Sequence, residues 1–142
     1  MDARGSSASA EPRRRILRGL LAASILVTAI HFADNAIFIE DYPQPDYITV
    51  PLIVATWIGW TAAAIGAYVL YRRDERSWVA HALLLVYAYA GLSTLGHYLY
   101  GSPSELPLWR NVSIVADGVA GFSILAFTLW SAVRGRRRPA PA

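Results

Sequence analysis

The stretch ILRGLLAASILVTAIHFADNAIFI, residues 16–39, decides the fold class of this chain. As a helix it would be about 36 Å long, which exceeds the ~30 Å hydrocarbon core of a bilayer. Three further apolar stretches follow at residues 48–71, 78–100 and 108–133. We therefore predict an all-α integral membrane protein, an up-down bundle of four transmembrane helices.

The composition agrees with this prediction, because 55% of the residues are hydrophobic and only 16% are charged. The absence of cysteine excludes disulfides, thiolate metal sites and thiol catalysis. We expect one transmembrane domain over residues 13–133. A disordered tail over residues 1–12 and a basic tail over residues 134–142 would flank it.

The arginines predict the orientation. All 13 basic residues are arginines, and all except Arg110 lie in the N-terminal arm, at residues 72–76 or in the C-terminal tail. The connections at 40–47 and 101–107 carry only acidic charges. The positive-inside rule then places both termini in the cytoplasm (N-in/C-in), and we expect the plasma (inner) membrane. The basic net charge reflects topology, so no nucleic-acid partner is expected.

The N-terminal arm also permits a second interpretation. Residues 13–18, RRRILR, together with the apolar run after them, resemble a twin-arginine export signal. No clear A-x-A cleavage site follows, and an apolar run that continues to Ile39 is too long for a signal peptide. We favour an uncleaved anchor.

Four ionisable residues inside the apolar stretches mark a candidate site: His31, Asp34, His97 and Asp117. Such groups cost roughly 2.5–3.5 kcal/mol each on insertion scales, so they usually face the bundle interior and are functional. Counting residues from the helix ends places all four in the outer half of the bundle. On the first helix, His31 continues a polar stripe. The stripe comprises Ser24, Thr28, His31 and Asn35.

Two imidazoles and a carboxylate are a ligand set that suits Zn²⁺ or Fe(II). Our leading hypothesis is a divalent-metal site that acts on a lipid or an apolar small molecule by hydrolysis or oxidation. The predicted ligands are His31, His97 and Asp117, with Asp34 as the catalytic base. Hydrogen bonds that orient these ligands would come from Asn35, Ser93 and Thr94.

Three alternatives stay open. The same residues could form a structural His/Asp network in a non-enzymatic membrane subunit. They could relay protons in a transporter, since the chain resembles the small multidrug-resistance exporters in size and number of spans. A b-type haem between His31 and His97 is less favoured, because Asp34 and Asp117 would lie beside the porphyrin. Expected partners are membrane lipids, an apolar ligand and further copies of the chain. Gly118 and Gly121 predict a close approach by another helix.

Overall fold

The computed structural model describes residues 11–136, which form four long helices and no strand. The long helices are α2 (Glu11–Ile37), α3 (Val50–Arg73), α4 (Trp78–Ser93) and α5 (Leu108–Arg136). Three short 3₁₀ helices connect them: η1 (Ile39–Asp41), η2 (Thr94–Leu99) and η3 (Pro103–Glu105). The predicted all-helical architecture is confirmed. The predicted tails lie mostly outside the described residues, although α2 already begins at Glu11 and α5 continues to Arg136.

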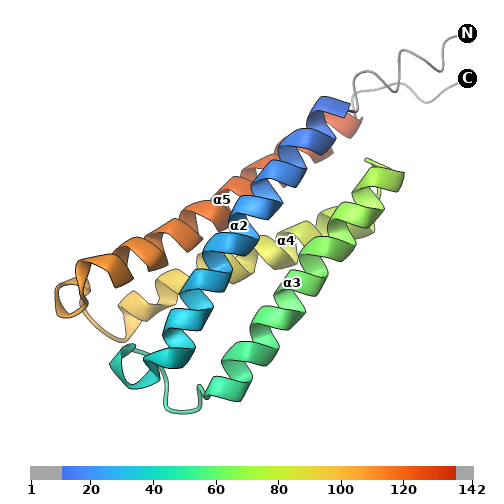
Figure 1. Cartoon of the computed structure of the whole chain (residues 1–142). Coiled ribbons are helices and arrows are strands. Elements are labelled where there is room, and N and C mark those ends of the chain that lie inside the picture. Colours follow the sequence, from blue (N-terminus) through green and yellow to red (C-terminus); the bar gives the residue numbers. More distant parts are fainter. Residues whose placement is uncertain (1–10, 137–142) are drawn as a thin grey trace, which may run out of the picture.

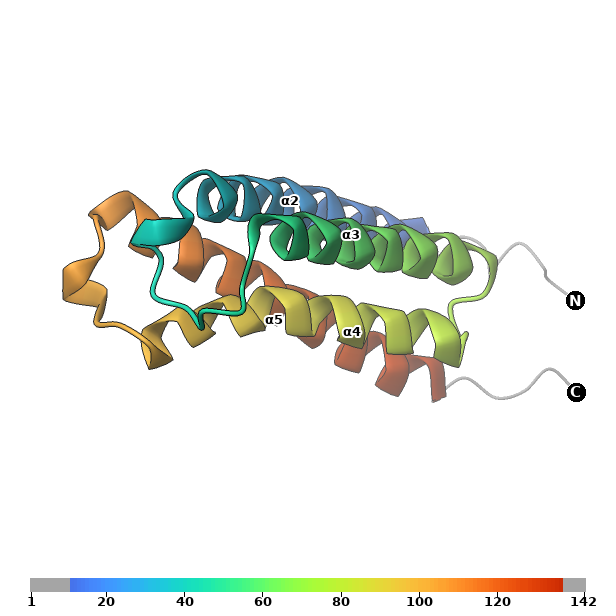
Figure 2. The same ribbon diagram turned by 90° about the horizontal axis from the view of Figure 1, so that it is seen from below.

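The four helices form two layers, one of α2 and α3 and one of α4 and α5 (Figures 1 and 2). Helix α2 packs against α3 and α5, and α4 packs against the same two helices. The start of α2 and the end of α5 lie at the same end of the bundle (Figure 1). We call this the proximal end. The opposite end, which holds residues 38–49 and 100–107, is the distal end.

Local chemistry explains most helix boundaries. Pro51 stands in the first turn of α3, where its missing N–H costs nothing. The Ser77 side chain caps α4 by accepting a hydrogen bond from the Ala80 amide at 3.3 Å. Pro43 and Pro45 lie in the irregular connection between α2 and α3.

The third predicted helix differs from the observed one. Residues 78–100 were expected to form one α-helix, but α4 ends at Ser93 and continues as the 3₁₀ helix η2. The Ser93 and Thr94 hydroxyls donate to the carbonyls of Ala90 and Gly91, both at 2.7 Å. Hydroxyls that bond back to the preceding turn loosen and bend a helix, which explains the change at this point.

The bundle is apolar outside and partly polar inside. Asp117 is 0% exposed and His31 is 1% exposed, whereas Leu26 and Phe122 are each 62% exposed. This is the reverse of a soluble protein and suits an apolar solvent. All four helical segments, counting α4 together with η2, are long and apolar enough to cross a membrane. The described residues therefore form a helical bundle that is compatible with a small membrane protein.

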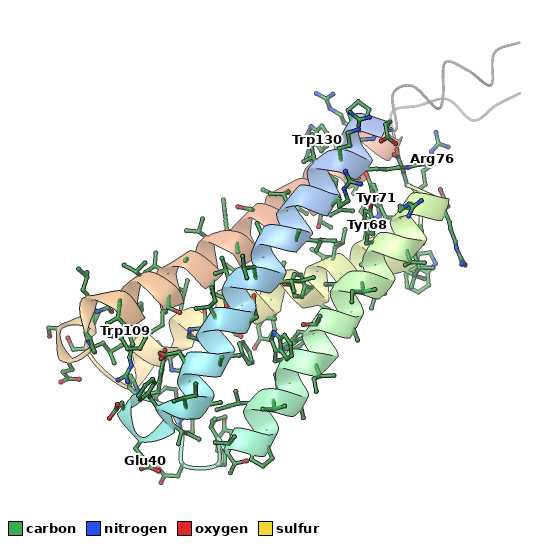
Figure 3. The ribbon with its side chains drawn as sticks, in the orientation of Figure 1. Glu40, Tyr68, Tyr71, Arg76, Trp109 and Trp130 are labelled. Carbon is green, nitrogen blue, oxygen red and sulfur yellow. The ribbon has the colours of Figure 1, made fainter. Side chains whose placement is uncertain are left out.

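Aromatic side chains gather at both ends of the bundle. Trp109 lies at the distal end, and Tyr68 and Trp130 lie at the proximal end (Figure 3). Tryptophan and tyrosine favour the two membrane–water interfaces, because their rings are apolar and their N–H or O–H groups are polar. This arrangement supports the same membrane plan.

The proximal half has a mainly apolar interior, although it also buries the hydroxyls of Thr128 and Ser131. Its buried members include Leu17, Leu21, Leu84, Ile124 and Phe127, which belong to one hydrophobic cluster. The distal half, by contrast, holds most of the buried polar side chains that the sequence singled out.

Candidate functional site

The predicted polar stripe of α2 faces the bundle interior. Ser24, Thr28 and His31 are each exposed by 2% or less, and Asn35 is 7% exposed. Asp34, on the neighbouring face, is 9% exposed. Burial of five polar residues along one apolar helix requires partners from the other helices, and these partners divide the residues into three groups.

The first group contains the two histidines. Their rings meet edge to face with centroids 5.5 Å apart, although His31 belongs to α2 and His97 to η2. His31 Nδ1 lies 3.3 Å from the Ser113 hydroxyl of α5. His97 Nδ1 lies 2.9 Å from the Pro43 carbonyl oxygen, and its Nε2 lies 3.4 Å from Asn35 Nδ2. The structure thus brings His31, His97 and Asn35 together.

The second group surrounds Asp34. Its carboxylate accepts a hydrogen bond from the Tyr42 hydroxyl and lies 3.6 Å from Arg110 Nε. Arg110 also donates through Nη2 to Asp41 at 2.8 Å. Burial and the bond to the Asp34 carboxylate raise the pKa of Tyr42 above its usual value. The Asp34 carboxylate thus contacts Tyr42 and Arg110 and does not line the pocket beside the histidines, so this geometry does not favour Asp34 as a general base.

Arg110 is the residue whose role sequence reasoning underestimated. Its guanidinium lies over three aromatic rings, with centroids 5.0–5.2 Å away, and the side chain is 5% exposed. The rings belong to Phe38, Tyr42 and Trp109. Arg110 belongs to α5, and it contacts aromatic rings and a carboxylate of the distal connection. These contacts stabilise the packing of that connection on α5. The sequence indicates only part of this role, a pairing of Arg110 with Glu105 or with an acid of the connection at 40–47, and the contact with Asp41 agrees with it.

The third group lies deeper in the bundle. Thr28 Oγ1 donates to Asp117 Oδ1 at 2.7 Å, so α2 and α5 are joined there. Thr28 precedes His31 by three residues, which is about 4.5 Å along the helix axis. Asp117 is therefore level with Thr28 and below the histidines.

This separation corrects the metal prediction. Among residues 11–136, no group of three or more histidine, cysteine, aspartate or glutamate side chains is placed to hold one metal ion. His31 and His97 meet, but Asp117 bonds to Thr28 and Asp34 bonds to Tyr42. The predicted Zn²⁺ or Fe(II) site is not supported. The reason is that residue counts give depth along a helix but not rotation about it.

The predicted orienting residues fare differently. Asn35 contacts His97, as expected of a residue that orients an imidazole. Ser93 donates to its own helix at Ala90, and Thr94 donates to Gly91 and lies 3.3 Å from the Ile114 carbonyl. These two hydroxyls thus bond to backbone carbonyls and make no hydrogen bond with either histidine.

Beside the histidines the bundle opens into a pocket of about 480 Å³. It lies at the distal end, among α2, α3, the end of α4 with η2, and the connection before α3. Its polar lining includes His31, Asn35, Gln44, Thr56, Ser93 and His97. Its apolar lining includes Phe32, Ile48, Leu52, Ile53 and Leu99. No aspartate, glutamate or arginine lines it.

Sequence reasoning missed two parts of this pocket. Thr56 brings α3 into the wall, although that helix lacks the ionisable residues that marked the others. The Pro43 carbonyl fixes His97, a backbone contact that no side-chain pattern reveals. Two prolines in the irregular connection between α2 and α3 indicate backbone carbonyls outside helices, but they do not indicate that His97 is the partner of one of them.

Comparison with known proteins gives no match, whether with family models, curated proteins or solved structures.

Proposed function

We propose that this protein is an integral membrane protein that binds an uncharged, largely apolar small molecule in the distal pocket. The observation that carries the proposal is the pocket lining. Buried His31, half-buried His97 and Asn35 stand beside apolar walls, and no aspartate, glutamate or arginine lines the space. A site that combines apolar walls with a few convergent polar groups is typical of small-molecule binding.

The size of the pocket fits this role. Its volume of about 480 Å³ lies within the ~300–1,000 Å³ common for ligand sites. Large hydrophobic side chains are exposed on every long helix, including Leu26, Ile58, Val86 and Phe122. Lipid surrounding such a surface is the natural source of an apolar ligand. With the distal end outward, as the arginine distribution predicts, the pocket serves the outer leaflet of the plasma membrane.

The two acids take structural roles in this proposal. Asp34 is held by Tyr42 and Arg110, and Asp117 accepts from Thr28. A buried acid that loses such partners destabilises a bundle, so these contacts join helices and the distal connection. The acids therefore form the frame of the pocket and the histidines form its polar wall.

A transmembrane proton relay has less support. Polar side chains continue from the histidines to Asp117 and Ser24, but Leu17, Leu21 and Ile124 pack in the next layer toward the proximal end. Proton relays need a continuous chain of polar groups or water, and this layer is apolar. Binding at one end of the bundle agrees better with the arrangement.

The experiment is photolabelling of the protein in lipid nanodiscs with an uncharged alkyl diazirine. The adducts are mapped by mass spectrometry. We expect adducts on pocket residues, and we expect Thr56→Phe to reduce them at least several-fold because its ring would occupy the pocket. Ala55→Phe is the matched control, since Ala55 is the adjacent, exposed residue of the same helix. Equal labelling of the pocket in both variants would contradict the proposal.

A further inference from the structure

The hydrogen bonds of the distal pocket allow the chemical class of its ligand to be narrowed. The starting point is the Pro43 carbonyl oxygen, which lies 2.9 Å from His97 Nδ1. A carbonyl oxygen only accepts hydrogen bonds, so His97 Nδ1 carries the proton and donates it. In the neutral imidazole the other nitrogen, Nε2, is then an acceptor.

This tautomer orients Asn35. The amide nitrogen Nδ2 lies 3.4 Å from His97 Nε2, and it donates to that acceptor. The reversed amide would place its carbonyl oxygen against Nε2, so that two acceptors would face each other. The contact with Pro43 thus fixes the Asn35 amide through His97.

The carbonyl oxygen of Asn35 is left over. It is buried and has no hydrogen-bond partner among the described residues, while the Asn35 side chain forms part of the pocket wall. A buried acceptor without a donor is unfavourable, and natural sites resolve this with a ligand or water that donates. As a residue Asn35 is 7% exposed and borders the pocket, so we place the missing donor in the pocket.

We infer that the ligand is an uncharged, largely apolar alcohol whose hydroxyl group donates a hydrogen bond to the Asn35 amide oxygen. The inference rests on the proposed function and names the ligand class of the same pocket. An ether, ketone or quinone has only acceptors and leaves Asn35 unsatisfied. An ammonium group donates, but the pocket wall offers no carboxylate to neutralise it.

The test compares two probes that differ in one hydrogen-bond donor, farnesol and farnesyl methyl ether. Each competes with the diazirine probe for the pocket in nanodiscs, and adducts on pocket residues are counted. A single neutral hydrogen bond corresponds to roughly a tenfold preference, so farnesol should compete about tenfold better than the ether. In Asn35→Leu, which keeps a side chain of similar size, the ratio should fall to about one.

The outcomes separate this inference from the proposed function. Equal competition by the alcohol and the ether in the wild-type protein overturns the inference, and so does failure of both to compete while the diazirine still labels the pocket. Absence of pocket labelling by the diazirine itself overturns the proposed function instead. The ratio of competition by farnesol to competition by farnesyl methyl ether in the wild-type protein tests the inference even where Asn35→Leu folds poorly.

Discussion

The contact between α4 and α5 permits a prediction from backbone geometry alone. A Cβ atom added to Gly121 would lie 2.7 Å from the Ala88 carbonyl oxygen and 2.8 Å from the Leu92 amide nitrogen. Ordinary Cβ contacts begin at about 3.4 Å, so α4 would have to retreat by about 0.7 Å. The obstructing atoms belong to the backbone of a packed helix, which cannot rotate away as a side chain can.

Two opposing effects set the magnitude for Gly121→Ala. In soluble helices alanine is favoured over glycine by about 1 kcal/mol. Overpacking a close contact costs typically about 1–3 kcal/mol. Gly91 of α4 belongs to the same close contact, because a Cβ added there would lie 2.9 Å from the Gly121 Cα. A retreat of α4 would therefore also loosen the packing between Gly91 and Gly121. We therefore expect a net loss of about 0–2 kcal/mol in the free energy of unfolding, which is about 1–3 kcal/mol below a glycine-to-alanine change that meets no clash.

The assay is reversible unfolding of the purified protein in mixed micelles with increasing SDS, followed by circular dichroism. Gly59→Ala is the matched control, because an added Cβ there meets nothing within 4 Å. We expect that variant to be as stable as the wild type or more stable. If Gly121→Ala matched Gly59→Ala, the close approach of α4 and α5 would be refuted.

Three further predictions concern the groups around the pocket. Arg110→Lys removes the planar guanidinium that contacts three rings and two carboxylates. The rate of amide hydrogen exchange over residues 38–49 should therefore rise at least tenfold. It should not rise in the control variant Arg72→Lys. Asp117→Asn keeps an acceptor for Thr28 and should lower the free energy of unfolding by less than about 1 kcal/mol, whereas Asp117→Ala should lower it by about 2–3 kcal/mol. Equal losses in the two variants would show that the hydrogen bond from Thr28 does not stabilise the bundle. Folding raises the pKa of Tyr42, so the contribution of Tyr42 to stability is complete below about pH 10 and falls at higher pH. Between about pH 9 and about pH 11, the free energy of unfolding should fall less steeply in Tyr42→Phe than in the wild type. Identical slopes in the two proteins would contradict this prediction.

The fold could be predicted from the sequence because each segment carries its own signal. A run of apolar residues long enough to cross a bilayer must form a helix, since lipid offers the backbone no other hydrogen-bond partner. The burial of Thr28, His31 and Asn35 followed from the same reasoning, because polar side chains on an apolar helix face inward. The close approach of another helix backbone at Gly121 also agrees with the prediction, whereas Gly118 faces the Leu95 side chain.

The predicted site was partly wrong for a physical reason. Depth along a helix follows from counting residues, and the four ionisable residues do lie in the same half of the bundle. Whether two of them touch depends on rotation and on the distance between helices, which all side chains in the interface decide together. Asp117 therefore met Thr28 in place of the histidines, and Asp34 met Tyr42 from a loop.

The sequence by itself determined the four apolar helices, the inward direction of the α2 stripe and the concentration of arginine on one side, because each depends on local composition and periodicity. Only the tertiary structure decided which polar groups share a hydrogen bond. Pro43 and Thr56 are not ionisable themselves, yet the Pro43 carbonyl orients His97 and Thr56 lines the pocket. Contacts between distant segments arise from packing the whole bundle, so no single stretch of sequence encodes them.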